Sequence, residues 1–214
     1  MHVDAAYGGV AAMLPSHAQV LDGASRADSV VVNPHKWLFT PFDLSAFYCR
    51  RMDLVRAAFS LTPEYLRTPE PAEVRNLMDT GVQLGRRFRS LKLWMVLRTF
   101  GARGLREHLT RHILLAQQLA SWVDGHPDFE RLAPVPFSVV CFRWKPSGRT
   151  LSPAELDAAN ERLLERINGL GEVFLSHTRL HDQLALRVAI GHLKTSESHV
   201  RRAWELLTTE ASRL

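Results

Sequence analysis

Val30-Val31-Val32-Asn33-Pro34-His35-Lys36-Trp37 is the stretch on which the interpretation of the chain depends. A short β-branched run that ends at a proline is typical of a buried strand with a turn beyond its tip. Lys36 is predicted to lie on that turn, and functional groups are often carried on such connections. Its side chain either extends to water along the apolar surface of Trp37 or lies in a partly dry pocket as a nucleophilic amine.

A second stretch, His2-Val3-Asp4-Ala5-Ala6-Tyr7-Gly8-Gly9, places a carboxylate at the end of another short apolar run. Asp4 and Lys36 are 36 − 4 = 32 residues apart, which is enough for a strand, a crossover and a parallel strand. The carboxyl ends of neighbouring parallel strands meet at one edge of a sheet. The acid and the amine are therefore predicted to share a crevice, as a pyridoxal phosphate site requires.

Both stretches resemble the group II pyridoxal-phosphate-dependent amino acid decarboxylases, the family of aromatic L-amino acid decarboxylase. The resemblance continues through 84–94, Leu-Gly-Arg-Arg-Phe-Arg-Ser-Leu-Lys-Leu-Trp, and 201–205, Arg-Arg-Ala-Trp-Glu. It implies an α/β fold of the fold-type I class. The family also carries a long preceding stretch that supplies half of the large domain, so the resemblance covers only the family's C-terminal half.

The resemblance implies a role for each matching residue. Lys36 would hold pyridoxal 5'-phosphate as a Schiff base and later act as a base, and Asp4 would pair with the pyridine nitrogen. Ala6 would lie under the cofactor ring, while Asn33 and His35 would hydrogen-bond the cofactor or its phosphate. Three alternatives stay open: Asp4 as a strand-end cap, and Asn33 and His35 as partners of the turn's own backbone.

Two further residues lie outside these stretches. Tyr65, in a proline-punctuated loop at 59–82, matches a tyrosine that donates a proton to the intermediate in the family; sibling enzymes that make aldehydes often have phenylalanine there. A tyrosine that anchors the loop is the alternative. Gly85 would approach a phosphate across a homodimer interface with shared active sites, or it would be a helix N-cap. His2 is interpreted as a packed histidine, and no metal site is predicted.

Composition bounds the remaining functions. The chain has 214 residues, of which 46% are hydrophobic and 23% charged, as in an ordinary globular protein. Cys49 and Cys141 are too few and too far apart for a disulfide framework or a zinc site, so a cytoplasmic location is expected. The sequence shows no secretion signal and no membrane span. The net charge of +5 is scattered, and the basic run 86–92 lies in an amphipathic helix, so nucleic-acid binding is not expected.

The predicted organisation has three parts. Residues 1–83 would form an incomplete cofactor-binding large domain, 84–125 linking helices, and 126–214 a small C-terminal α/β domain. Strands are expected at 1–7, 30–32, 43–49, 137–141, 173–175 and 184–190, and a short helix or ordered loop at 15–26. Helices are expected at 85–100, with Gly101 as C-cap, at about 104–123 and 153–168, and at the C-terminus around Val200–Leu207.

The function that follows is decarboxylation of an L-amino acid, preferably an aromatic one, to the amine and carbon dioxide. The substrate's electrons would flow into the protonated cofactor ring, and Tyr65 would return a proton to the α-carbon. Two alternatives within the family are aldehyde synthesis and decarboxylation of an acidic amino acid. A third is an inactive truncated product or interaction module, because the missing half carries most of the substrate pocket.

Overall fold

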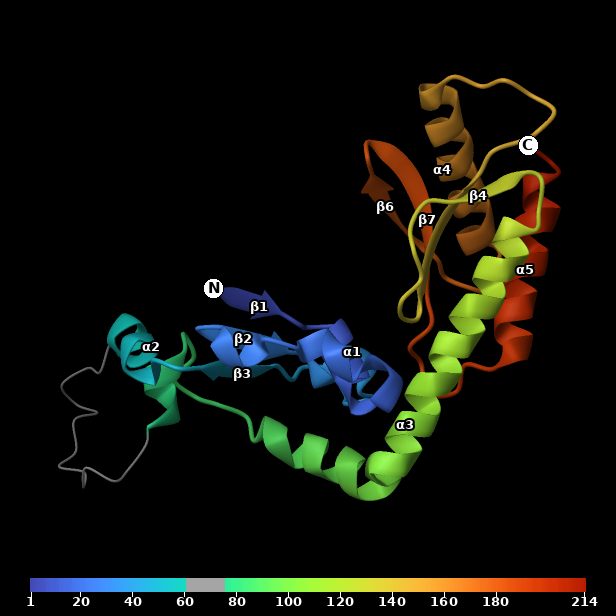
Figure 1. Cartoon of the computed structure of the whole chain (residues 1–214). Helices are drawn as coiled ribbons and strands as arrows, with labels where there is room; N and C mark the ends of the chain where they lie inside the picture. The colour runs from blue at the N-terminus through green and yellow to red at the C-terminus, as the bar shows by residue number, and fades with distance from the viewer. Residues whose placement is uncertain (61–75) are drawn as a thin grey trace. The chain divides into compact units, whose positions relative to one another are not determined.

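The computed structural model describes residues 1–60 and 76–214, which form two compact units, Met1–Ala102 and Arg103–Leu214 (Figure 1). Each unit has its own sheet. The finer sequence-based division at residues 83 and 125 stays a prediction.

The first unit contains a three-stranded sheet in the order β1-β2-β3. Its strands are β1 (His2–Asp4), β2 (Ser29–Val32) and β3 (Ala46–Cys49). β1 and β2 are parallel, whereas β2 and β3 are antiparallel. The strands predicted at 1–7 and 43–49 are therefore present, but both are shorter than predicted.

Short helices connect the strands of the first unit. The crossover from β1 to β2 consists of the 3-10 helices η1 (Gly8–Met13), η2 (Pro15–Leu21) and η3 (Ala24–Arg26). η1 lies close to the strand ends: a Cβ on Gly9 would come within 2.9 Å of the Ala5 Cβ and 3.1 Å of a Val32 methyl. The other elements are α1 (Pro34–Trp37), α2 (Met52–Phe59), which was not predicted, and η5 (Leu77–Thr80).

The long helix α3 (Arg89–Asp124) is two helices joined at Gly101, where φ is 63° and ψ is 176°. The predicted break at Gly101 is confirmed. The predicted start at residue 85 is wrong, because the helix begins at Arg89. The larger part of α3, from Arg103 onward, belongs to the second unit.

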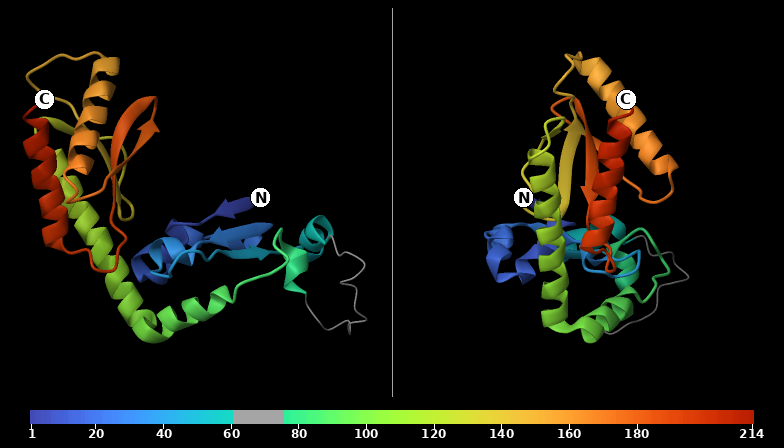
Figure 2. Two further views of the ribbon diagram at one scale, coloured as in Figure 1. Left: turned by 180° about the vertical axis from the view of Figure 1, so that it is seen from behind. Right: turned by 90° about the vertical axis from the view of Figure 1, so that its right-hand side faces the viewer.

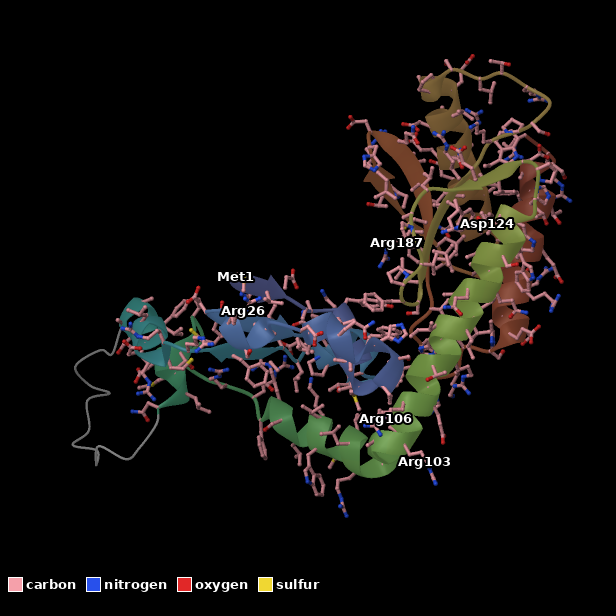
Figure 3. The ribbon with its side chains drawn as sticks, in the orientation of Figure 1. Met1, Arg26, Arg103, Arg106, Asp124 and Arg187 are labelled. Atoms are coloured by element: carbon pink, nitrogen blue, oxygen red, sulfur yellow. The ribbon has the colours of Figure 1, made fainter. Side chains whose placement is uncertain are left out.

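The second unit contains an antiparallel sheet in the order β4-β5-β7-β6. Its strands are β4 (Phe129–Arg131), β5 (Val139–Trp144), β6 (Ser176–Leu180) and β7 (Gln183–Ala189). Helices α3, α4 (Pro153–Gly169) and α5 (Glu197–Ala211) lie on one side of this sheet and share a core with it (Figure 2). At the end of α3, the carboxylate of Asp124 accepts bonds of 2.9–3.2 Å from Arg131 on β4 (Figure 3).

One strand of the second unit was placed wrongly from the sequence. Residues 173–175 precede β6 and are not a strand. The side chain of Asn168 binds both backbone groups of Leu175, with its amide donating at 3.0 Å and its oxygen accepting at 2.8 Å. The backbone of Leu175 is therefore satisfied by a helix side chain instead of by a neighbouring strand.

Candidate active site

The parallel pairing of β1 with β2 places the two key stretches side by side. Asp4 is in register with Val31. The hydrogen bonds continue beyond the strand ends: Ala5 N donates to Val31 O, and Asn33 N donates to Ala6 O, both at 3.0 Å. The carboxyl ends of the two strands are thus neighbours, which confirms the predicted parallel arrangement.

Lys36 lies on the single helical turn α1 that follows β2. Pro34 occupies the first helical position, where its missing N–H costs nothing, and Lys36 N donates to Asn33 O at 2.9 Å. The side chain of Lys36 is exposed, whereas that of the next residue, Trp37, is fully buried. Trp37 therefore anchors the turn, and the amine is left accessible at the strand ends.

Tyr7 connects the two stretches through its ring. It stacks on Trp37 with the ring centroids 5.0 Å apart and the planes 3° from parallel. Because Tyr7 follows Asp4 and Trp37 follows Lys36, the stack holds the acid-bearing and the amine-bearing segments together. Tyr7 lies within the motif at 2–9, but its ring contact was not predicted.

Asp4 is exposed, and its Oδ1 accepts the N–H of Ala6 at 3.0 Å. The carboxylate therefore caps the end of β1, as the simpler alternative held, and this bond also orients it. Ala6 itself is buried, and its backbone is committed to Asp4 and Asn33. The strand end is thereby fixed on both sides.

Asn33 and His35 both contact the segment that leads into β3. Asn33 Oδ1 accepts the hydroxyl of Ser45 at 2.6 Å. His35 Nδ1 accepts the N–H of Leu44 at 3.0 Å and also lies beside the Leu44 carbonyl. Nδ1 is thus engaged with backbone, as the alternative interpretation expected, and Nε2 is the nitrogen that a ligand could contact.

Asp43, which the sequence analysis missed, ties this segment to the residues before α3. Its carboxylate pairs with Arg87 and, at 3.2 Å, with Arg89. Partial burial raises the pKa of Asp43, but hydrogen bonds from its own backbone and from Arg89, with the charges of both arginines, lower it overall. The Asp43 ion pairs therefore link the lysine turn to the stretch that contains Gly85.

Gly85 is exposed and lies four residues before the start of α3, so the N-cap alternative is wrong. A Cβ there would meet no atom within 4 Å. Tyr65 lies outside the described residues. Of the seven predicted site residues, Asp4, Ala6, Asn33, His35 and Lys36 lie together at the carboxyl ends of β1 and β2.

Within the described ranges, 1–60 and 76–214, no group of three or more His, Cys, Asp or Glu side chains could hold a metal ion. In the same ranges, none of the helices combines the length and apolar character needed to span a membrane.

An exposed amine and an oriented carboxylate at neighbouring strand ends suit a ligand with an aldehyde and a basic ring nitrogen. Pyridoxal phosphate has both groups, so the residues present fit this cofactor. The fold and the pair together define the fold-type I class of pyridoxal phosphate proteins.

Comparison with known proteins agrees with this class. Residues 1–145 match the pyridoxal-dependent decarboxylase conserved domain. The chain is 42% identical over 217 residues to phenylacetaldehyde synthase of Arabidopsis thaliana, covering 100% of this chain and 44% of that protein. It is 41% identical over 217 residues to tryptophan decarboxylase 1 of Oryza sativa subsp. japonica, covering 98% and 42%.

Among solved structures, the crystal structure of Oryza sativa TDC with PLP and tryptamine superposes with a TM-score of 0.90 at 39% identity. The match covers 99% of this chain and 44% of that one. The chain therefore belongs to the pyridoxal-dependent decarboxylase family. It spans less than half the length of the relatives to which it is similar.

Proposed function

We propose that this chain supplies the lysine-bearing part of a pyridoxal-phosphate-dependent decarboxylase that acts on an aromatic L-amino acid. The observation that carries the proposal is the parallel register of β1 and β2, which brings Asp4 and Lys36 to adjacent strand ends. The names of the relatives support an aromatic substrate, because they include a tryptophan decarboxylase and aromatic-L-amino-acid decarboxylases. Turnover would also require the part of the family fold that this chain does not contain.

Lys36 and Asp4 would have different roles in the reaction. The amine of Lys36 would hold the cofactor covalently and accept or return a proton once the substrate amine has displaced it. The carboxylate of Asp4, held by the Ala6 N–H, would keep a proton on the pyridine nitrogen. Bound pyridoxal phosphate supplies the electron sink that loss of carbon dioxide requires.

The remaining residues would bind and orient. Ala6 would leave room beneath the ring, and Asn33 and the Nε2 of His35 would contact the cofactor or its phosphate. Gly85 would let backbone approach a phosphate across a subunit interface. Tyr65 would donate the proton to the α-carbon after carbon dioxide leaves.

A second candidate is aldehyde synthesis from an aromatic amino acid. It is supported by the 42% identity to phenylacetaldehyde synthase. The tyrosine at position 65 supports decarboxylation instead. Product analysis separates the two, since one reaction yields the amine and the other an aldehyde.

The direct test uses absorbance spectra of the purified chain with pyridoxal phosphate, before and after borohydride reduction, followed by peptide mapping. The chain has four lysines, at positions 36, 92, 145 and 194, so the adduct is readily located. We expect reduction to fix the cofactor on Lys36, Lys36→Ala to abolish the adduct, and Lys92→Ala, the matched control, to retain it. An adduct that persists in Lys36→Ala would overturn the assignment. If the folded wild-type chain forms none, the site needs the rest of the family fold.

We also infer a cytoplasmic location and a homodimer with shared sites for the working enzyme. The two free cysteines, Cys49 and Cys141, support a reducing compartment. Sedimentation of the active assembly would test the dimer, and fractionation of the source cells would test the location.

A further inference from the structure

The chain leaves the lysine turn through a backbone conformation that its side chain does not favour. Phe39, which follows the helix-capping residue Leu38, has a φ of 55°. Glycine usually occupies this position after a helix, because a Cβ there crowds the backbone. Leu38 N and Thr40 N both donate to Pro34 O, at 3.2 and 3.3 Å, so the chain reverses at Phe39 and closes on the start of the turn. Strained residues of this kind persist only where their surroundings fix them.

The ring of Phe39 contacts α3. Its centroid lies 6.3 Å from that of Phe100, and the two ring planes are inclined by 59°. Phe100 is the last residue of α3 before the break at Gly101. Thr40, the residue after Phe39, is only 3% exposed. The strained reversal is therefore packed and tied to the end of the first half of α3.

A second contact ties the same connection to the beginning of α3. Asp43 pairs with Arg87 and with Arg89, the first residue of the helix. The side chains of Asp43 and Arg89 are 31% and 21% exposed, whereas that of Arg87 is 71% exposed. Partly buried charges are screened less by water and salt than surface charges are. Arg89 is therefore the partner whose attraction to Asp43 is screened less.

The residues on either side of Asp43 contact the lysine turn instead. The ring of Phe42 meets that of His35 edge to face, with the centroids 5.0 Å apart and the planes at 73°. Leu44, which is 5% exposed, donates its N–H to His35 Nδ1 at 3.0 Å. His35 directly precedes Lys36. A shift of Asp43 relative to α3 is therefore passed to the residue next to the amine.

We infer that Phe39 and Asp43 are positioning residues for Lys36. They hold the connection 38–45 against the first half of α3 at Phe100 and Arg89, and this helical half acts as a brace for the lysine turn. The two contacts are 100 − 89 = 11 residues apart on the helix, or about 17 Å along its axis, so together they fix the direction of the connection as well as its place. The inference rests on the proposed function, because it concerns the amine that would hold the cofactor.

The competing explanation is that these contacts stabilise the first unit as a whole without placing the amine. Hydrogen exchange separates the two, because local opening exposes only the amides nearby, whereas a loss of global stability exposes all of them. Four backbone amides report on the turn and its connection: Lys36, Leu38, Thr40 and Leu44. The reference amides are those of Ala5 and Asn33, which join the ends of β1 and β2.

The first set of variants tests the ion pair. Asp43→Asn removes the charge, while the control, Asp53→Asn, removes a carboxylate that pairs with Arg51 at the start of α2 in the same unit. We expect Asp43→Asn to speed exchange at Lys36 and Leu44 about twofold to fivefold and to leave the reference amides unchanged. Asp43→Glu keeps the charge and should restore part of the protection, and Asp53→Asn should alter neither group. Equal acceleration of both groups by Asp43→Asn, or none, would overturn the role of Asp43.

The second set tests the ring contact. Phe100→Ala removes the ring that meets Phe39, while Leu97→Ala shortens a side chain of the same helical half that is 43% exposed. We expect Phe100→Ala to speed exchange at Leu38 and Thr40 about twofold to tenfold, and Leu97→Ala to change it less than about twofold. Similar exchange at these two amides in both variants would contradict the contribution of the ring contact.

The rate of borohydride-fixed adduct formation at Lys36 connects this placement to the chemistry. Asp43→Asn and Phe100→Ala should slow the adduct relative to their controls. Exchange is measured without pyridoxal phosphate, so it tests the brace even where the isolated chain forms no adduct, and its failure is distinct from failure of the cofactor assignment. Faster exchange at the turn with adduct rates equal to those of the controls would limit both residues to a structural role and overturn the inference.

Discussion

At the scale of single residues, the stack of Tyr7 on Trp37 is the contact that joins the two functional segments. Tyr7→Leu removes the ring. We expect it to lower the free energy of unfolding by about 0.5–1.5 kcal/mol beyond the effect of the lost buried apolar area. Tyr7→Phe keeps the ring and should retain stability. Urea unfolding measures both, and the rate of borohydride-fixed adduct formation at Lys36 shows whether the turn has moved. Equal adduct rates in Tyr7→Leu and Tyr7→Phe would limit the stack to a stability role.

Tyr65 can be tested by its effect on products. In an assembly that turns over substrate, Tyr65→Phe removes the phenolic proton and keeps the ring. We expect cofactor binding to persist while amine production falls or is replaced by aldehyde, because proton return to the α-carbon is impaired. Chromatography of the products measures the ratio. Unchanged decarboxylation would remove Tyr65 from the mechanism.

The sequence predicted the charged pair of the site but not its supports. Asp4 and Lys36 could be placed because strand-end position follows from local apolar runs. The contacts of Asp43 with Arg87 and Arg89 and of Asn33 with Ser45 could not, because they join residues 12 to 46 positions apart. Such contacts depend on the tertiary fold, which a local sequence pattern does not predict.

At the scale of elements, the start of α4 rests on a capping box. Ser152 Oγ accepts the N–H of Glu155 at 3.3 Å, and the Glu155 carboxylate accepts Ser152 N–H at 2.7 Å. Ser152→Ala should destabilise the second unit by about 1 kcal/mol. Ser121→Ala on the exposed side of α3 is the control. It should not lower the free energy of unfolding, since alanine is favoured in a helix interior. Denaturant midpoints compare the two, and equal midpoints would show that the cap contributes no net stability.

Gly101 divides α3 through its backbone conformation. Its φ of 63° with ψ of 176° is a combination that side chains other than glycine's rarely adopt, although a Cβ would meet nothing within 4 Å. Gly101→Ala should therefore cost about 1–3 kcal/mol or straighten the break. Gly148→Ala, also in open space but without a positive φ, should be close to neutral. Thermal unfolding measures the cost, and circular dichroism detects a gain in helix.

Helices were predicted well where the apolar periodicity extended over several turns and where a capping residue or a glycine marked the end of the helix. The capping box at Ser152 and the glycine at position 101 fixed two helix limits. α2 and β4 were missed because each is short, eight and three residues. The strand expected at 173–175 failed because the side chain of Asn168 took over its backbone bonds.

At the scale of the whole molecule, acid stability should reflect His112 on α3. Burial, with the nearby charges of Arg111, His108 and His192, lowers the pKa of His112 from 6.5 to about 4. Between these values the unfolded chain binds more protons than the folded one. Stability should therefore fall as pH drops from about 6.5 to about 4, by at most about 1.4 kcal/mol per pH unit.

Replacing the imidazole tests this pH dependence. His112→Gln should flatten the slope between pH 6.5 and 4, the values that bound its shift. His177→Gln, at an exposed histidine on β6, is the matched control. The slope of stability against pH is measured from urea unfolding midpoints at several pH values. A slope that persists in His112→Gln would assign the effect to other groups.

The sequence could not predict how much of the first unit is left uncovered. Apolar residues such as Phe88 and Met95 were expected to pack but are exposed, and the periodicity that predicts a buried face does not say whether its partner is in the chain. The second unit closes its own core, and on the other face of its sheet Arg187 extends away from the helices (Figure 3). Its helices were accordingly predicted better.

One continuous segment of fewer than forty residues, 2–38, carries both the acid and the amine. Within it, His2 is in register with Ser29 and Asp4 with Val31. Hydrogen bonds within this segment and the Tyr7–Trp37 stack contribute to the spacing of the reactive groups. Substitutions elsewhere can then reshape the surroundings of a substrate while the reactive pair stays in place. Divergence in substrate among related enzymes is therefore expected outside residues 2–38, and transplanting this segment between relatives should transfer no change in specificity.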